Sequence, residues 1–284
     1  MQSIVLATHG GVSADGAALA ALQLAVRLQV PLIPLVVYAP IRVVDYGFGA
    51  SYVPSPEDEA AVKDAVVASV TDQLSRCGIT STPPTVRTGI VAQEIAAAAR
   101  VLGAGLIVTG LGPHSIVDRA LGGETALHLA QDATAPVLAV PAPATTIPRR
   151  VIAAIDFSAT SLRAARTAAA WLRAGDELHL VFVAPKLRHN EAALPASQPV
   201  VDRLTKTGGE LGVATGVRVD ATVLSADPAR ALLDYAQRID ADLIALGSHG
   251  YGAIKRIVVG SVASKIIRVA TCAVLVAPIG CLQA

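Results

Sequence analysis

Glycines near the carboxyl end of the chain are spaced in a way that suits a phosphate group. The segment GSHGYGAIKRIVVGS, residues 247–261, follows the strand-like run DLIAL and leads into the helix-like run VASKIIRVA. Glycines allow a tight loop and close approach of a ligand to the backbone, and the first turn of a helix presents unpaired N–H groups with a partial positive charge. We therefore expect an anion site here, with Gly260-Ser261 at the start of the helix and Ser261 as its N-cap.

A carboxylate occupies a comparable place earlier in the second half. Asp156 directly follows the apolar run RVIAAI, residues 150–155, and a helix-like segment begins at residue 159. In an open parallel sheet, ligands bind beyond the carboxyl ends of the strands, where the strand order reverses. Asp156 and the glycine loop would then flank one cleft, where the carboxylate accepts a hydrogen bond from a ligand N–H or O–H. Asp156 also suits the N-cap of the following helix, and the two roles are compatible.

Other phosphate-binding and catalytic motifs are missing from the sequence. It contains no G-x-x-x-x-G-K-[ST], which excludes a P-loop, and no G-x-G-x-x-G after the first strand of either half, so a dinucleotide site is unsupported. No Ser-His-Asp order at a nucleophile turn, no supported carboxylate pair and no Walker-type magnesium ligands occur. We therefore assign no catalytic residue and no metal site.

Strand-length apolar runs alternate with helical-period segments along the whole chain, a pattern typical of βαβ units and a parallel sheet. The predicted strands are 3–8, 31–38, 84–88, 106–110 and 135–140, then 150–155, 177–183, 217–224, 242–247 and 272–277. The predicted helices are 14–29, 57–77, 91–103 and 122–131, then 159–173, 197–212, 227–239 and 260–270. We expect Trp171 and Phe182 to lie in the core.

The two halves also match in sequence. Residues 86–110 align without a gap on 223–247. The match indicates an internal duplication of a domain of about 140 residues, joined by the linker-like stretch PAPATTIPRR. The predicted fold is α/β, with two tandem, doubly wound domains of five parallel strands each, at residues 1–143 and 149–284. The apolar last strands of the two domains would be unprotected sheet edges that can pair with each other.

Composition limits the class of protein. The 284 residues are 53% hydrophobic and 16% charged with a net charge of +1, which allows sizeable cores and gives no basic surface for nucleic acid. Mean hydropathy is +0.55, but charges, prolines or glycines interrupt the long apolar stretches, so we expect no membrane span and no signal peptide. The three cysteines fit no zinc spacing and favour a reduced, cytoplasmic setting over a Cys272–Cys281 disulfide.

The residues singled out above resemble those of a known family. The pattern Gly247-x2-Gly250-x9-Gly260-Ser261 is similar to the ATP-binding signature of the universal stress protein family. The turn Ile155-Asp156-Phe157-Ser158 resembles that family's adenine-contacting turn, and the ending GSVASKIIRVATCAVLVAP looks like its last helix and strand. The resemblance covers residues 150–278, and the first half repeats the fold with weaker motifs. The chain thus resembles a tandem member of the family, with adenine nucleotide alpha hydrolase-like domains.

The resemblance implies a nucleotide site in the second half. Asp156 and the main chain of Val183 would hold the adenine and the ribose, beside Ile155 of the same turn. The phosphates would bind the signature residues, and neighbours in the segment would add contacts; the residues are Gly247, Gly250, Gly260 and Ser261, with Ser248, His249 and Val262. ATP, with or without Mg²⁺, is the implied ligand, and AMP, ADP and cAMP stay open because they use the same adenine pocket.

The first half carries different residues at these positions. The alignment places His9 opposite Asp156, and it places Pro113 and Glu124 opposite Gly250 and Ser261. Proline has no N–H to donate, and a glutamate on a helix N-terminus repels phosphate while it satisfies the unpaired donors itself. We therefore expect the first half to bind no ATP.

The implied function is nucleotide-linked regulation of a stress response, through a protein partner that the sequence does not name. Two copies of single-domain family members associate, so we expect the two halves to form an intramolecular pseudo-dimer, with a further homodimer left open. Three alternatives also stay open: a scaffold that binds no nucleotide, a slow ATPase or phosphotransferase, and a cyclic-nucleotide sensor.

Overall fold

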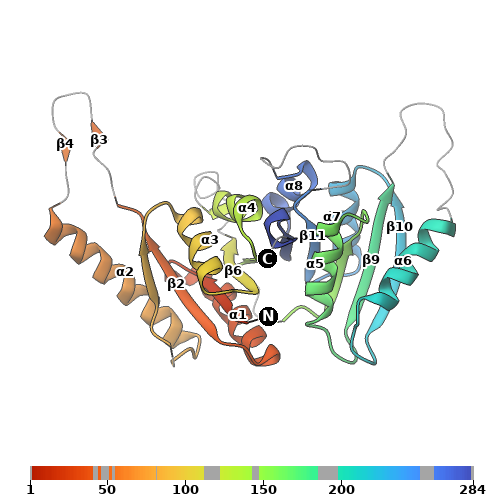
Figure 1. The fold of residues 1–284 in the computed structure, drawn as a ribbon, viewed down its shortest axis with the longest axis horizontal. Coiled ribbons are helices and arrows are strands. Elements are labelled where there is room, and N and C mark those ends of the chain that lie inside the picture. Colours follow the sequence, from red (N-terminus) through yellow and green to blue (C-terminus); the bar gives the residue numbers. More distant parts are fainter. Residues whose placement is uncertain are drawn as a thin grey trace.

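The computed structural model describes residues 2–40, 44–45, 51–52, 55–80, 82–111, 122–142, 147–184, 198–249 and 259–282. The chain forms one large sheet with helices on both faces (Figure 1). This α/β architecture confirms the predicted fold class.

The first half contributes five strands to the large sheet. They are β1 (Ile4–Ala7), β2 (Leu32–Tyr38), β5 (Thr85–Thr88), β6 (Leu106–Leu111) and β7 (Val137–Pro141). Its helices are the short 3-10 turn η1 (Val12–Ala14), then α1 (Asp15–Leu28), α2 (Pro56–Arg76), α3 (Val91–Val101) and α4 (Gly122–Asp132). Two short strands, β3 (Val44–Asp45) and β4 (Ser51–Tyr52), pair with each other away from the large sheet and were not predicted.

The second half repeats this order of elements. Its strands are β8 (Arg150–Ala154), β9 (Glu177–Ala184), β10 (Arg218–Ser225), β11 (Leu243–Gly247) and β12 (Ala273–Ala277). Its helices are α5 (Ala159–Ala169), α6 (Gln198–Glu210), α7 (Pro228–Arg238) and α8 (Ser261–Val269), and the 3-10 turn η3 (Ile279–Leu282) follows β12. Helix α5 ends four residues earlier than predicted, because the chain turns before Trp171 and Leu172, which are nevertheless buried and prolong the apolar pattern.

The ten strands form one sheet in the order β10-β9-β8-β11-β12-β7-β6-β1-β2-β5. Within each half the five strands of this sheet are parallel, and the strand order reverses next to β1 and next to β8. The last strands of the halves, β7 and β12, pair antiparallel, with Leu138 opposite Leu275. This confirms the predicted pairing of the two apolar edges. Because the junction is antiparallel, the strands of the two halves run in opposite directions, and the carboxyl ends of one set lie beside the amino ends of the other.

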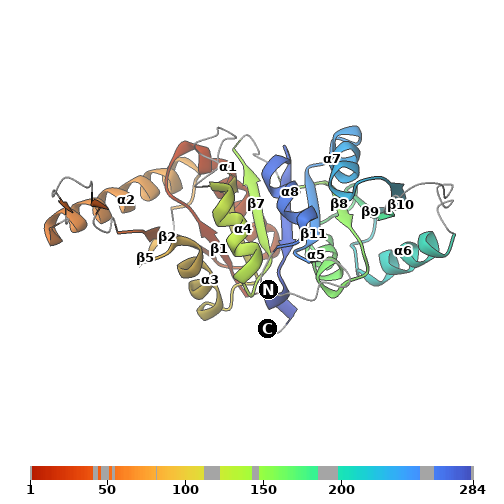
Figure 2. The same cartoon turned by 90° about the horizontal axis from the view of Figure 1, so that it is seen from above.

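Helices cover both faces of the sheet. Apolar residues of α1, α2, α5 and α6 pack on one face, and those of α3, α4, α7 and α8 pack on the other. Figure 2 shows α4 and α8 side by side over the junction of β7 and β12. The residues of β1, β7 and β12 are all buried, which explains why their sequences are continuous apolar runs without alternation.

Polar contacts join the halves beside the linker. The Arg27 guanidinium at the end of α1 donates to the Trp171 carbonyl at 2.6 Å and lies 3.8 Å from the Asp176 carboxylate. Arg173 donates to the Arg27 carbonyl at 2.9 Å. The Ile147 N–H donates to the Gln23 side chain at 3.0 Å, so the end of the linker-like stretch is held against α1.

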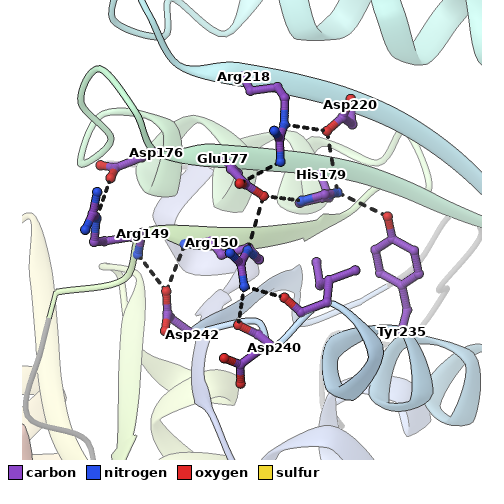
Figure 3. Close-up of polar contacts among 11 residues, drawn as sticks. Arg149, Arg150, Asp176, Glu177, His179, Arg218, Asp220, Tyr235, Asp240 and Asp242 are labelled. Atoms are coloured by element: carbon purple, nitrogen blue, oxygen red, sulfur yellow. Dashed lines mark hydrogen bonds and ion pairs between the residues drawn. The ribbon is translucent and has the colours of Figure 1, made fainter.

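Charged side chains form ion pairs and hydrogen bonds at the amino ends of the strands in the second half (Figure 3). Glu177 accepts from Arg150 at 3.1 Å and from Arg218 at 2.6 Å, and His179 Nε2 lies 3.3 Å from the same carboxyl group. Burial acts to raise the pKa of Glu177, but the hydrogen bonds from His179 and Arg150 and the two arginine charges outweigh it and hold the pKa below its ordinary value of 4.5.

Two findings concern the setting of the chain. Among the described residues, no helix is long and apolar enough to cross a membrane. Cys77, Cys272 and Cys281 are all free thiols, and Cys77 and Cys281 are buried.

Candidate functional site

A cavity of about 560 Å³ opens at the carboxyl ends of β8, β9 and β11. Nine of the ten site residues predicted from the sequence line it, and they are Ile155, Asp156, Val183, Gly247, Ser248, His249, Gly260, Ser261 and Val262. The tenth, Gly250, lies outside the described residues. Segments that are about 100 residues apart in the sequence therefore meet at the point where the strand order reverses, which is where open α/β sheets bind ligands.

Two glycines allow the loop after β11 to lie close to its neighbours. A Cβ atom on Gly247 would collide with Thr160 Oγ1 and would lie 2.8 Å from the Ser161 nitrogen. A Cβ atom on Gly260 would lie 3.1 Å from the Ser248 carbonyl oxygen, to which the Gly260 N–H donates at 2.7 Å. Contacts within the protein thus explain both glycines, whether or not a ligand also approaches them.

Helix α8 begins at the cavity without a side-chain cap. It starts at Ser261, and its N-cap is Gly260, so the prediction that Ser261 is the N-cap was wrong by one position. Gly260 has no side chain to accept from the first N–H groups of the helix, and no acidic residue lies in the first turn. Ser261, Val262 and Ala263, whose N–H groups belong to this turn, all line the cavity. The helix end therefore offers donors and a partial positive charge to an anion.

Asp156 is held by the turn that follows β8. Its Oδ1 accepts from the Ser158 N–H at 3.0 Å and from Ser158 Oγ at 2.6 Å. Ser158, and not Asp156, is the N-cap of α5, since its Oγ accepts from the Ser161 N–H at 3.2 Å. Asp156 is half-buried and lines the cavity, so its carboxylate is oriented there by the capping serine.

Ser248 and His249 are buried within the loop after β11. Ser248 Oγ and His249 Nδ1 lie 2.9 Å apart, and the His249 carbonyl accepts from Thr160 Oγ1 at 2.9 Å. The Ser248 N–H donates to the Ala277 carbonyl at 3.0 Å. His249 Nε2 is buried and has no hydrogen-bond partner among the residues that the structure describes. These contacts fix the loop on α5 and β12 and give both residues a structural role in the site.

The structure adds residues to the cavity that sequence reasoning missed. They are Ala154, Ser161, Val181, Phe182, Pro228, Leu232, Leu246 and Ala263. Phe182, expected in the core, is half-buried and packs against the core on the face of the sheet covered by α5 and α6, and the residue also borders the cavity near the end of β9. Most of the others lie on strands or helices outside the glycine segment, and nothing in their local sequence marks them. The one available signal was position, because residues near the carboxyl ends of β8, β9 and β11 must border this edge.

The first half has a different turn at the equivalent place. Strand registers align Ile4 with Val151, so His9 corresponds to Asp156 as predicted. His9 is exposed, and its Nδ1 accepts from the Gly11 N–H at 3.2 Å. Helix α4 begins at Gly122, so Glu124 lies in its first turn. Pro113 lies outside the described residues.

Fold and cavity together define a tandem, doubly wound α/β protein with a ligand-sized hollow at the carboxyl ends of its second set of strands. The family model named "Universal stress protein family" matches residues 1–141 and again residues 148–278. The chain therefore belongs to the universal stress protein family and is a tandem member of it.

Several known proteins are similar to this chain. A universal stress protein of Methanocaldococcus jannaschii is 28% identical over 137 residues, which cover 45% of this chain and 81% of that protein. The crystal structure of a universal stress protein from Archaeoglobus fulgidus superposes with a TM-score of 0.69 at 19% identity and covers 97% of this chain and 96% of its own. A universal stress protein solved in complex with cAMP covers 50% of this chain and 97% of its own, with 24% identity and a TM-score of 0.37.

Proposed function

We propose that the second half binds one adenine nucleotide, ATP or a close relative, and that the first half binds none. The protein would act as a nucleotide-linked regulator in a stress response, through a protein partner and without a catalytic residue of its own. The observation that carries the proposal is the meeting of Asp156, the end of β9 and the uncapped start of α8 around one cavity of about 560 Å³. Cavities of this size enclose small-molecule ligands.

Each part of the cavity suits one part of the nucleotide. The Asp156 carboxylate accepts N–H or O–H donors of the adenine or ribose, and the aliphatic residues Val181, Val183 and Leu232 suit the flat base. The first turn of α8 suits the phosphates, because its N–H groups and partial charge face an anion without a competing side chain. The predicted contact at Gly250 remains part of this proposal.

Calorimetry tests the proposal most directly. ATP, ADP, AMP and cAMP would each be titrated into the wild type, with Mg²⁺ and again with EDTA, and into the Asp156→Ala and His9→Ala variants. We expect one site per chain that binds ATP with micromolar affinity (about −8 kcal/mol). Asp156→Ala should bind ATP more weakly than the wild type, and His9→Ala should bind it with unchanged affinity.

Other outcomes would select among the alternatives. Two sites per chain would contradict the proposed loss of binding in the first half. Tighter binding of cAMP than of ATP would favour a cyclic-nucleotide sensor, and steady phosphate release that Asp156→Ala abolishes would favour a slow ATPase. Absence of binding by all four nucleotides would leave a scaffold as the function.

A further inference from the structure

A buried histidine on β9 makes two polar contacts near the amino ends of the strands (Figure 3). His179 Nε2 lies 3.3 Å from the Glu177 carboxylate, and His179 Nδ1 lies 3.1 Å from the Tyr235 hydroxyl of α7. The Tyr235 hydroxyl lies in turn 3.3 Å from Thr222 Oγ1 on β10. His179 and Tyr235 are each only 7% exposed, so the contact between them is shielded from solvent.

The first half builds the same place from apolar residues. Strand registers align Ile33 with His179, and the match of residues 86–110 with 223–247 aligns Ala98 with Tyr235. Ile33 and Ala98 both belong to the apolar packing of β2 and α3. The fold therefore does not need polar side chains here, and their burial costs free energy because it removes them from water. Their presence in the half that contains the described cavity points to a use.

The buried histidine and the cavity share the layer between β9 and α7. Side chains two residues apart on a strand point to the same face, so His179, Val181 and Val183 lie on the face that α7 covers. Tyr235 and Leu232, three residues apart, likewise lie on one side of α7. Val181, Val183 and Leu232 line the cavity. The contact between His179 and Tyr235 therefore joins the same strand and helix that form this part of the cavity wall.

Two carboxylates flank the histidine. Glu177 lies on the Nε2 side, and Asp220 Oδ2 on β10 lies 3.9 Å from His179 Nδ1. The pKa of Glu177 is below its ordinary value of 4.5, so this carboxylate is charged at neutral and mildly acidic pH. Arginines oppose a further positive charge here, since they pair with these carboxylates or lie over the Tyr235 ring; they are Arg150 of β8, Arg218 of β10 and Arg238 of α7.

The charge of the imidazole decides which neighbour its Nδ1 favours. A neutral ring that donates from Nε2 to Glu177 accepts at Nδ1, where the Tyr235 hydroxyl can donate and the Asp220 carboxylate cannot. A protonated ring donates from both nitrogens, and a charged acceptor makes the stronger hydrogen bond. Histidine ordinarily changes its charge between about pH 5 and pH 8. The neutral ring is thus bonded to α7, whereas the protonated ring is drawn to β10.

We propose that His179 is a pH-sensitive switch of the second half, which holds α7 through Tyr235 when it is neutral and pairs with Asp220 when it is protonated. In mildly acidic conditions Leu232 of α7 is then held less firmly at the cavity, and the affinity for the nucleotide falls. The effect on affinity rests on the proposed nucleotide site, whereas the effect on α7 does not. By linkage, a bound nucleotide disfavours protonation of His179 to the same degree.

Hydrogen exchange of the α7 amides tests the switch without a nucleotide. Exchange over Pro228–Arg238 would be compared at about pH 7.5 and about pH 5.5, after correction for the intrinsic rates, in the wild type and in His179→Gln. We expect the protection of α7 to fall about tenfold more in the wild type, because glutamine does not titrate. Asp220→Asn removes the charge that attracts the protonated ring and should reduce this fall. Equal changes in the wild type and His179→Gln would overturn the proposal.

Calorimetry with ATP at the same two pH values tests the link to the cavity. The affinity should fall about tenfold more in the wild type than in His179→Gln, since protonation of ATP itself and of His249 affects both proteins alike. Tyr235→Phe keeps the ring and removes the hydroxyl, so it should bind ATP more weakly at the higher pH and lose the extra fall. Thermal unfolding checks that each variant is folded, and Tyr235→Phe is the second variant if His179→Gln is not.

A matched control is available in the same chain. His128 is an exposed histidine on α4, so His128→Gln should keep the pH dependence of the wild type in both measurements. A wild type that binds no nucleotide but shows the pH-dependent exchange of α7 would overturn the proposed function and support the switch. A wild type that binds ATP, with the same pH dependence in His179→Gln and Tyr235→Phe, would overturn the switch alone.

Discussion

The turns after β1 and β8 occupy equivalent places in the two halves and are built differently. In the first half α2 lies directly against Gly10, and Thr8 Oγ1 donates to the buried Gln73 side chain at 2.7 Å, which ties the turn to the helix. In the second half the turn carries Asp156 and Phe157 and borders a cavity of about 560 Å³. The two turns thus differ in what lies against them, which is the backbone of α2 in the first half, and the Arg203 side chain of α6 and a cavity in the second.

The largest effect is expected from placing a side chain on the first turn. Gly10→Ala combines a left-handed backbone with a Cβ atom 2.6 Å from the backbone of α2, so helix or turn must shift. We expect a loss of about 3 kcal/mol in the free energy of unfolding, measured by urea denaturation.

The reverse substitution in the second half is the matched comparison. Phe157 has a φ of +62°, so Phe157→Gly relieves a strained backbone while it removes the ring contacts with Arg203 and Phe182. We therefore expect the free energy of unfolding to change by about 1 kcal/mol or less. If Gly10→Ala and Phe157→Gly lower the free energy of unfolding equally, the two turns are under the same packing constraint, which would contradict the expected difference between the halves.

The next largest effect is expected when the first turn of α8 is given the acidic residue that the first half has at the equivalent position. Ser261→Glu places a carboxylate in the first turn of α8, as Glu124 lies in the first turn of α4. Repulsion of the phosphates should weaken ATP binding about 100-fold, while the helix gains about 0.3–1 kcal/mol. Calorimetry and thermal unfolding together check this; loss of both binding and stability would contradict it, and Ser261→Gln controls for side-chain size.

A smaller effect is expected at the carboxylate of the cavity. Asp156→Ala removes the acceptor for the nucleotide and for Ser158, so we expect about tenfold weaker ATP binding and about 1–2 kcal/mol lower stability. His9→Ala at the equivalent place of the first half, where the side chain is exposed, should change neither quantity measurably. Similar effects of the two substitutions on ATP binding would mean that both halves take part in the site.

The smallest effect is expected on the pH dependence of stability, through Glu177. Glu177 has a lowered pKa in the folded chain, so its contribution to stability is present above pH 4.5 and is lost as the pH falls below that value toward the folded-state pKa. Glu177→Gln should lower the thermal midpoint at pH 7, and the two midpoints should converge as the pH falls below 4.5. The corresponding residue of the first half is Pro31, which does not titrate. A constant difference between variant and wild type across this range would contradict the assignment.

The sequence predicted the fold well because its signals are redundant. Every strand of the large sheet was expected within one or two residues, since buried parallel strands such as β7 and β12 are short apolar runs between longer periodic segments. The end of α5 was missed because buried Trp171 and Leu172 continue the apolar pattern after the helix has stopped. Pattern alone does not register that change of backbone direction.

The site was predictable where a spaced motif or the family resemblance marked it. The glycine segment and Asp156 were found because their spacing is recognisable, and the structure brings them to one cavity. Phe182 and Leu232 border the same cavity from β9 and α7, but no motif marks them, and on β9 the resemblance pointed only to Val183. The left-handed backbone of Phe157 was equally hidden, because sequence patterns assign that conformation to glycine.

The antiparallel pairing of β7 with β12 also determines how the protein responds to dilution. Two separate chains that share a sheet dissociate when their concentration is below the dissociation constant, and their unfolding midpoint depends on the protein concentration. Here one covalent chain supplies both partners, so the effective concentration of each half near the other is fixed by the linker. The junction should therefore persist at any protein concentration in the cell, and each half is free to change its own surface without the need to match an identical twin.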